Sequence, residues 1–310
     1  MSQSVSVALR QAARRLAAAG VDTPRLDAEV LLADLLGLDR LHLYTQADRL
    51  LTPGEQAAYE QRVQARARRQ PVAQIVGYKE FYGYRFTVRP GVLVPRPETE
   101  KVVEEALARW DEMERPPGRR WHIVDVGCGS GVIGLTLVLL RPDTELIAID
   151  QSPAACALTA ENALRLGVGE RVRVVQGDLL SPLLPAGDPP PASSLSGISS
   201  IDLVVCNPPY VPLPDWDELA PEIRHWEPKM AVAAGGDGLA VYRLLLPQAI
   251  RVLRAGGVCV VEIGDGQAEA VGQLGRAVGF TRERVGYDWA GRQRVVSWIA
   301  PATRKDARVD

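Results

Sequence analysis

The 310-residue sequence predicts an α/β fold in which a doubly wound, largely parallel sheet follows a small helical domain. Three observations support this prediction. From residue 121 onward, short apolar runs of strand length alternate with segments of helical periodicity. A glycine-rich loop joins the first of these runs to a helical segment, as in folds that bind ligands at the carboxyl edge of a sheet. Before residue 75, apolar residues recur at helical spacing.

The composition limits the classes of protein to consider. Apolar residues make up 46% of the chain, and 36 Lys and Arg against 38 Asp and Glu give a formal net charge of −2. This balance argues against a protein that mainly coats nucleic acid, although a local basic patch is compatible with it. No apolar run reaches about 18 residues and the N-terminus lacks a signal-peptide pattern, so we expect a cytoplasmic protein without a membrane span.

The cysteine pattern predicts neither a disulfide framework nor a metal site. The four cysteines form no C-x-x-C pair, and each lies in or beside an apolar segment. We therefore expect small core or loop residues in a reducing compartment, and no metal cofactor. These residues are Cys128, Cys156, Cys206 and Cys259.

The N-terminal segment predicts a helical domain over residues 1–75. Apolar spacing indicates helices over 5–19 and from Thr23-Pro24 to Gly37. Thr52 and Glu55, with Pro53 between them, have the pattern of a capping box that starts a third helix. The end of this helix is basic, and we favour a solvated face there over a docking surface for an acidic partner. Its arginines are Arg62, Arg66, Arg68 and Arg69.

Residues 76–92 predict a β-hairpin linker because aromatic and β-prone residues surround Gly83. The following stretch, Gly91–Glu100, holds Pro95 and Pro97 on either side of Arg96. This stiff, charged stretch before a helix is a candidate wall of a site; a plain linker with a helix cap is the alternative.

The glycine-rich loop after the strand 121–126 is a candidate cofactor site. Its glycines allow the backbone to approach a ligand closely. Asp125 precedes the loop by two residues; its carboxylate would repel a pyrophosphate but attract the ammonium group of an amino acid. The loop residues are Gly127, Cys128, Gly129, Ser130 and Gly131.

Two later strands also end in acidic residues. Asp150 lies about 20 residues after the glycine loop, the spacing of an acid that accepts hydrogen bonds from ribose hydroxyls. Asp178 and Leu179 follow a third strand, where an adenine would find an acceptor and an apolar cover. For Asp178, an ordinary turn or N-cap role is the alternative.

The stretch Asn207-Pro208-Pro209-Tyr210 follows the apolar run 201–206. Because prolines are rigid and carry no N–H, the carbonyls of Asn207 and Pro208 remain free acceptors. With the Asn207 side chain, they would suit a planar –NH2 group, and Tyr210 offers a ring for stacking. A simple turn is the alternative.

The remaining segments complete the predicted fold. Residues 184–200 are rich in Pro, Ser and Gly and predict a surface insertion without chemistry. Residues 211–236 lack clear periodicity and could form the rim of a substrate site. We expect a helix over 239–253, a strand over 257–263, a helix over 267–278 and a closing antiparallel pair. The tail 303–310 is expected to be frayed.

Taken together, these motifs resemble a class I S-adenosylmethionine-dependent methyltransferase, and more closely the PrmC/HemK family of protein-glutamine methyltransferases. The motifs are Val94–Glu100, Asp125–Gly131, Asp150, Asn207–Tyr210, and Glu227-Pro228 with the glycine run that ends at Gly238. The resemblance implies a Rossmann-like seven-stranded sheet, with methyltransferase domain 93–302, a helical substrate-docking domain and a hairpin linker.

The resemblance also implies roles for residues. Residues 127–131 would wrap the methionine part of S-adenosyl-L-methionine, Asp150 would bind its ribose, and Leu179 would cover its adenine. Asn207 would contact both the cofactor and the substrate, and residues 207–210 would hold the glutamine of the GGQ loop of a peptide chain release factor and position it for methyl transfer. Many relatives carry a bulkier residue at the place of Leu179. Nucleic acid would be met only through the release factor.

Two other functions are compatible with these motifs. A DNA or rRNA amino methyltransferase would use the same residues, Asn207–Tyr210, as a clamp on adenine or guanine. Such an enzyme needs a basic groove and room for an extruded base. The near-neutral charge counts against it, while the basic helix end keeps it open. A non-catalytic binding module is the other alternative; the intact loop, acid and clamp count against it.

Overall fold

The computed structural model describes residues 3–114, 118–184 and 201–302, so most of the 184–200 insertion and the tail lie outside the described residues. The chain divides into two compact units. The first comprises Met1–Tyr78, Val88–Pro90 and Leu219–Glu227, and the second comprises Lys79–Thr87, Gly91–Glu218 and Pro228–Asp310. Each unit is described separately below.

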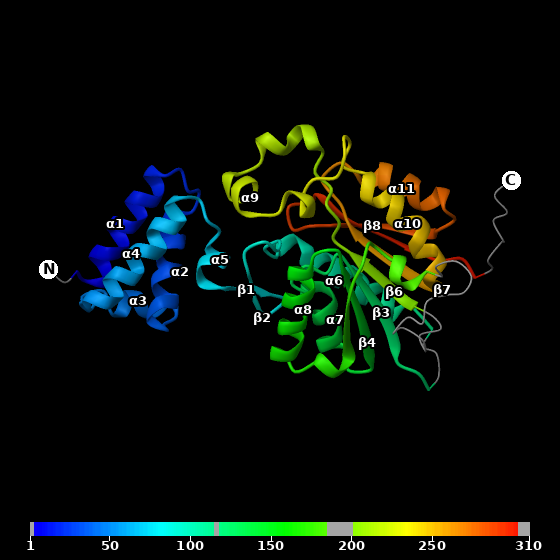
Figure 1. Cartoon of the computed structure of the whole chain (residues 1–310), viewed down its shortest axis with the longest axis horizontal. Coiled ribbons are helices and arrows are strands. Elements are labelled where there is room, and N and C mark those ends of the chain that lie inside the picture. The colour runs from blue at the N-terminus through cyan, green and yellow to red at the C-terminus, as the bar shows by residue number, and fades with distance from the viewer. Residues whose placement is uncertain (1–2, 115–117, 185–200, 303–310) are drawn as a thin grey trace. The chain divides into compact units, whose positions relative to one another are not determined.

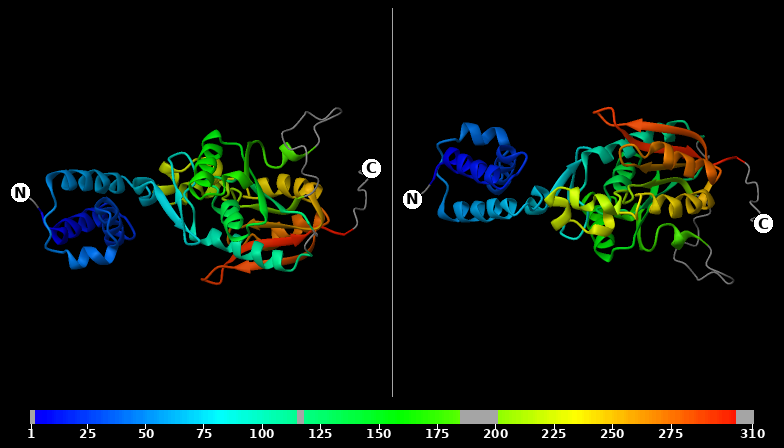
Figure 2. Two further views of the ribbon diagram at one scale, coloured as in Figure 1. Left: turned by 90° about the horizontal axis from the view of Figure 1, so that it is seen from below. Right: turned by 90° about the horizontal axis from the view of Figure 1, so that it is seen from above.

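The first unit is helical. Its core consists of apolar side chains from the first four helices, among them Leu16, Leu31, Leu43 and Tyr59. Figure 2 shows these helices, in blue, packed together. The expected three long helices are present, and three short ones, α3, α5 and α9, were not foreseen. The helices are α1 Val5–Ala18, α2 Pro24–Leu36, α3 Arg40–Thr45, α4 Pro53–Ala67, α5 Val72–Val76 and α9 Pro221–Trp226.

The capping box at the start of α4 is confirmed. Thr52 Oγ1 accepts a hydrogen bond from the Glu55 backbone N–H at 3.2 Å, and Glu55 Oε2 accepts one from the Thr52 N–H at 2.8 Å. Two N–H groups that the helix itself leaves unpaired are thereby satisfied.

The expected solvated face at the end of α4 is wrong for Arg66, which is only 6% exposed. Its guanidinium lies 2.6 Å from Asp27 of α2 and 2.8 Å from Glu222 of α9. Arg69 also pairs with Glu222, at 2.7 Å. The basic residues therefore meet acidic partners inside their own unit, because a charge that leaves water is stable only when it is paired.

The second unit is built on a seven-stranded sheet of order β5-β4-β3-β6-β7-β9-β8. The first five strands pair in parallel and the last two run antiparallel, as the sequence predicts. The strands are β3 Trp121–Val126, β4 Thr144–Asp150, β5 Val172–Gln176, β6 Ile201–Cys206, β7 Leu253–Glu262, β8 Thr281–Tyr287 and β9 Gln293–Ile299. A separate hairpin consists of β1 Tyr78–Phe81 and β2 Tyr84–Thr87.

Helices cover both faces of this sheet (Figure 1). Neighbouring residues of β3 point to opposite faces, so that Ile123 joins the core under α6 and α7 whereas Val124 joins the core under α10 and α11. Both faces are thus buried, which explains the continuous apolar runs of the parallel strands. The helices are α6 Glu100–Asp111, α7 Val132–Leu140, α8 Pro153–Arg165, α10 Ala240–Val252 and α11 Ala268–Ala277.

The strand order places the predicted motifs at one edge. β3 lies between β4 and β6, and Val126 at the end of β3 is in register with Ile149 and Cys206. The three segments that follow these residues therefore leave the sheet side by side. This point, where the strand order reverses, is the usual ligand-binding position in such sheets. Across the described residues, no helix is long and apolar enough to cross a membrane.

Candidate active site

The glycine loop between β3 and α7 has the left-handed backbone that only glycine adopts easily. Gly127, Gly129 and Gly131 have φ angles of 68°, 58° and 82°. A Cβ on Gly131 would lie 2.7 Å from Leu135 Cδ1, so this glycine also allows close packing at the start of α7. The N–H groups of Gly127 and Cys128 donate to the Ile149 carbonyl at 2.8 and 3.1 Å, which fixes the loop to β4.

Asp150 is held by two backbone groups at the end of β4. Its Oδ2 accepts a hydrogen bond from Gly129 N and its Oδ1 one from Ser152 N, both at 2.9 Å. A carboxylate has about four acceptor positions, so each oxygen retains capacity for a further donor. The orientation of this acid is therefore set before any ligand binds.

Asp125 is buried beneath the loop. Its Oδ2 accepts a hydrogen bond from Gly134 N at 2.8 Å, while Oδ1 has no hydrogen-bond partner among the described residues. Burial, reinforced by the charge of Asp150, raises the pKa of Asp125 to about 7. A buried acceptor without a partner suits a ligand that brings a donor or a positive charge.

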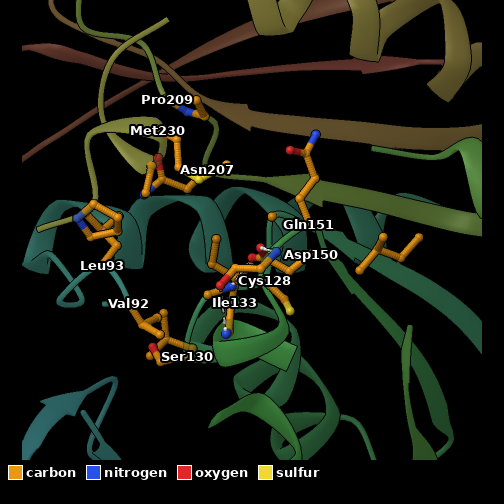
Figure 3. A pocket seen from close by; sticks show the side chains of 18 of the residues that line it. Val92, Leu93, Cys128, Ser130, Ile133, Asp150, Gln151, Asn207, Pro209 and Met230 are labelled. Carbon is orange, nitrogen blue, oxygen red and sulfur yellow. Dashed lines mark hydrogen bonds between the residues drawn. The ribbon is translucent and has the colours of Figure 1, made fainter. Parts of the chain in front are cut away.

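A cavity of about 380 Å³ opens at this edge. Its size falls in the range of small-molecule sites. In Figure 3, Asn207, Pro209 and Met230 lie on the upper side of the view, and Cys128, Ile133 and Asp150 lie below them. The lining residues are Gly91, Val92, Leu93, Pro95, Arg96, Thr99, Gly127–Ser130, Val132, Ile133, Ile149–Ser152, Ala155, Gly177, Leu179, Asn207, Pro209, Pro228, Met230, Ala231, Ala233 and Val241.

Most residues expected to bind a cofactor line this cavity, but some predicted site residues do not. Gly131 caps α7, Asp178 is exposed and hydrogen-bonded to Gln151, and Pro208 is buried. Tyr210 packs against the core and also does not line the cavity.

Met230 lines the cavity from within the 211–236 stretch that was expected to form a rim. The lining residues that sequence reasoning did not single out are Val132, Ile133, Ile149, Gln151, Ser152, Ala155, Gly177 and Val241. Gln151 directly follows Asp150, the last residue of β4. Its position next to this predicted site residue was the only feature of the sequence that indicated a role in the site.

Asn207 and Tyr210 are fixed by residues that come from other elements. Asn207 Nδ2 donates to Thr99 Oγ1 at 3.1 Å, and the Tyr210 hydroxyl donates to Glu262 Oε1 at 3.2 Å. The Tyr210 carbonyl accepts a hydrogen bond from Gln267 Nε2 at 3.0 Å. Burial and the neighbouring Glu262 raise the pKa of Tyr210, so its hydroxyl stays protonated.

The described residues hold no His, Cys, Asp and Glu group suited to a metal ion, and the four cysteines are free thiols. The polar side chains that line the cavity include the Asp150 carboxylate, the carboxamides of Gln151 and Asn207, and the hydroxyls of Thr99, Ser130 and Ser152. Such a set suits a ligand with hydroxyl, amine and planar amide groups.

Comparison with known proteins agrees with this arrangement. Residues 119–282 match the family model of a methyltransferase domain. The N-terminal domain of human METTL16, solved in complex with SAH, has the same fold with a TM-score of 0.50 and 13% identity. The alignment covers 83% of this chain and 86% of that one. The fold and the domain match therefore define the chain as a methyltransferase.

The family can be stated more narrowly. Residues 7–77 match the PrmC N-terminal domain. The release factor glutamine methyltransferase of Moorella thermoacetica is 42% identical over 288 residues, which covers 93% of this chain and 95% of the relative. That of Geobacter sulfurreducens is 41% identical, with 91% of each chain covered. The chain belongs to the release factor glutamine methyltransferase family, which confirms the resemblance drawn from its motifs.

Proposed function

We propose that this chain transfers a methyl group from S-adenosyl-L-methionine to the side-chain amide nitrogen, N5, of the glutamine in the GGQ motif of class-one peptide chain release factors. The names of its relatives support the substrate. The observation that carries the proposal is the position of Asn207, a carboxamide at the end of β6 that lines the same cavity as the glycine loop and Asp150.

The residues around the cavity fit the proposed cofactor. The left-handed glycine backbone of the loop accommodates close approach of a ligand. Asp125 does not line the cavity, so its attraction of the ammonium group through the buried Oδ1 stays a prediction. Asp150 keeps acceptor capacity for ribose hydroxyls, and Leu179 supplies an apolar surface for adenine. A cofactor role for Asp178 stays a prediction. When bound, the cofactor supplies a methyl group on a positively charged sulfur.

The clamp residues would hold the substrate amide. An amide nitrogen is a poor nucleophile because its lone pair is delocalised, so the protein must align it with the methyl group. The Oδ1 of Asn207, which lines the cavity, and the carbonyl of Pro208, which does not line it, would accept the two amide hydrogens and turn the nitrogen toward the donor. Orientation of this kind contributes up to about 7–11 kcal/mol.

The same acceptors become more effective as the reaction proceeds. The nitrogen gains positive charge in the transition state, and the two oxygens then bind its hydrogens more strongly than in the ground state. A methylated amide cation is very acidic and loses its proton readily, so the mechanism requires no dedicated general base. Pro209 and Tyr210 would complete the clamp by keeping the loop rigid.

The test separates binding from transfer. The purified chain is incubated with labelled cofactor and a release factor, and mass spectrometry locates the added methyl on the GGQ glutamine. In Asn207→Ala we expect methylation to be lost, and calorimetry measures separately how much cofactor affinity the Asn207 side chain contributes. Near-normal turnover in this variant would remove Asn207 from the chemistry.

Parallel incubations with DNA and rRNA address the alternative substrate. Methylation of a base in place of the release factor would overturn the proposal. The likeness to METTL16 concerns the fold alone and does not favour that outcome.

We further propose that the chain acts in the cytoplasm, with residues 1–75 docking the release factor, 76–92 as linker and 93–302 as the catalytic domain. These boundaries and this location stay predictions. Deletion of residues 1–75 would test the docking role, with loss of release-factor binding and retained cofactor binding as the expected result.

A further inference from the structure

The carboxamide of Asn207 is oriented by a second residue, Thr99, to which no role has been assigned above. Thr99, at the end of the 3-10 turn Pro97–Thr99, is 2% exposed, and its Oγ1 accepts a hydrogen bond from Asn207 Nδ2 at 3.1 Å. A carboxamide can present either its oxygen or its NH2 group to a ligand. Because Thr99 engages the NH2 group, Asn207 Oδ1 is the atom left for another partner, and the described residues donate no hydrogen bond to it.

A third residue determines which way the Thr99 hydroxyl points. Glu262, at the end of β7, is 1% exposed and accepts a hydrogen bond from the Tyr210 hydroxyl at 3.2 Å, and it lies close to the Thr99 hydroxyl. A hydroxyl has a single proton. If Thr99 donates this proton to Glu262, its oxygen can only accept from Asn207, so a flipped Asn207 amide would meet no donor.

We propose that Thr99 is a positioning residue for methyl transfer: supported by Glu262, it holds Asn207 with Oδ1 toward the substrate amide. This inference rests on the proposed function, since it assumes that Asn207 Oδ1 accepts a hydrogen from the glutamine. It also gives a reason for the stiff Pro95-Arg96-Pro97 segment, which leads directly into Thr99 and lines the cavity at Pro95 and Arg96.

The alternative is that Thr99 merely fills space, and a matched pair of variants distinguishes the two. Thr99→Val keeps the shape but removes the hydroxyl, whereas Thr99→Ser keeps the hydroxyl and removes a methyl group. We expect Thr99→Val to lower kcat for release-factor methylation by about 10- to 100-fold, the scale of a slightly misplaced reactive group. Cofactor affinity should stay unchanged, and Thr99→Ser should remain close to wild type in kcat.

A spectroscopic measurement makes the test independent of activity. In protein labelled with 15N-asparagine, the side-chain amide signals of Asn207 are identified by their absence in Asn207→Ala. These signals should shift in Thr99→Val and stay in place in Thr99→Ser. Thermal unfolding of each variant confirms that it is folded, and Thr99→Ala replaces Thr99→Val if the latter fails to fold.

The outcomes are distinct. Wild-type kcat in Thr99→Val, equal losses in the Val and Ser variants, or unshifted Asn207 signals in Thr99→Val would overturn the inference. If the wild-type chain itself does not methylate the release factor, the proposed function fails instead, and the amide signals still report whether Thr99 holds Asn207.

Discussion

Two carboxyl groups buried at the carboxyl edge of the sheet, Asp125 and Glu262, have unusual titration behaviour. Burial raises the pKa of each to about 7. For Glu262 the hydroxyls of Thr99 and Tyr210 and the charge of Arg294 oppose the effect of burial on the pKa, and the charge of Glu98 adds to it. The charged form of each carboxyl is disfavoured because the surrounding side chains replace water poorly.

These pKa values predict a loss of stability with rising pH. Between about pH 4.5 and 7 these two carboxyls bind more protons in the folded protein than in the unfolded chain, so their contribution to the free energy of unfolding falls as pH rises through this window. Glu262→Gln removes one of the two groups. At pH 8 the free energy of unfolding of the variant should exceed that of the wild type by up to about 3 kcal/mol. At pH 5 the two free energies should differ little. Urea unfolding of the ligand-free protein measures this; parallel pH curves for variant and wild type would contradict it.

Gly238 is a residue whose missing side chain makes room for the clamp. Its φ is 75°, and a Cβ there would lie 2.2 Å from the Tyr210 carbonyl oxygen. Gly291 has the same φ of 75° but no atom within 4 Å of such a Cβ. Both alanine variants carry the backbone strain, about 1–2 kcal/mol, but only Gly238→Ala also displaces Tyr210.

We therefore expect Gly238→Ala to destabilise the protein by at least about 1 kcal/mol more than Gly291→Ala, because of the added clash. It should also lower methyl transfer, which Gly291→Ala should leave unchanged. Chemical unfolding and turnover assays of the two variants provide the comparison. Equal effects of both substitutions would show that the contact with Tyr210 is unimportant.

At the scale of elements, the start of α4 illustrates how a local pattern stabilises a helix. Thr52→Ala removes the cap hydrogen bond to Glu55 and should cost about 1 kcal/mol of stability. Ser4 precedes α1 in the same position but makes no cap hydrogen bond with its side chain. Ser4→Ala should therefore cost less in the same denaturation experiment, and a larger loss than in Thr52→Ala would refute this assignment.

The ends of three neighbouring strands, β3, β4 and β6, determine where the cavity forms. The residues that follow β3, β4 and β6 converge because those strands are neighbours in register, although they are separated by tens of residues in the sequence. The loops hold their conformations through hydrogen bonds to one another, as the Gly129 to Asp150 contact shows. The cavity is thus a consequence of sheet topology more than of any single loop.

At the scale of the whole molecule, the short helix α9 belongs to the helical unit, although most of that unit, Met1–Tyr78, lies more than 130 residues earlier in the chain. α9 follows the clamp by about ten residues, yet Glu222 in α9 pairs with Arg66 and Arg69 of the helical unit. The chain then continues into Pro228 and Met230, which line the cavity. The residues that form the cavity rim therefore follow directly in the chain after a segment that belongs to the helical unit.

Glu222→Gln should loosen this segment. Hydrogen bonds to charged groups contribute about 1.5–3 kcal/mol, and the variant weakens those from both arginines. We expect faster hydrogen exchange over residues 219–227. Glu218→Gln is the control, because Glu218 is exposed and outside this network. Unchanged exchange in Glu222→Gln would mean that packing alone holds α9.

Expectations that depend on neighbouring residues in the chain were accurate. The glycine loop, the ends of most helices and strands and the capping box follow local rules, so the patterns around Gly127 and Thr52 were informative. Expectations about which way a side chain faces were weaker. Arg66 was expected in solvent and is buried, and Tyr210 was expected as a stacking surface but points its hydroxyl at Glu262.

By itself, the sequence determined the order of most elements and the residues that end each strand at the candidate site. Periodicity and turn chemistry encode these features over a few residues at a time. Only the tertiary structure brought the Thr99 hydroxyl to the Asn207 carboxamide, the Tyr210 hydroxyl to Glu262, and Glu222 to Arg66 of α4. These contacts join segments 50 to 160 residues apart, and the energy of burying paired polar groups selects them only once the chain has folded.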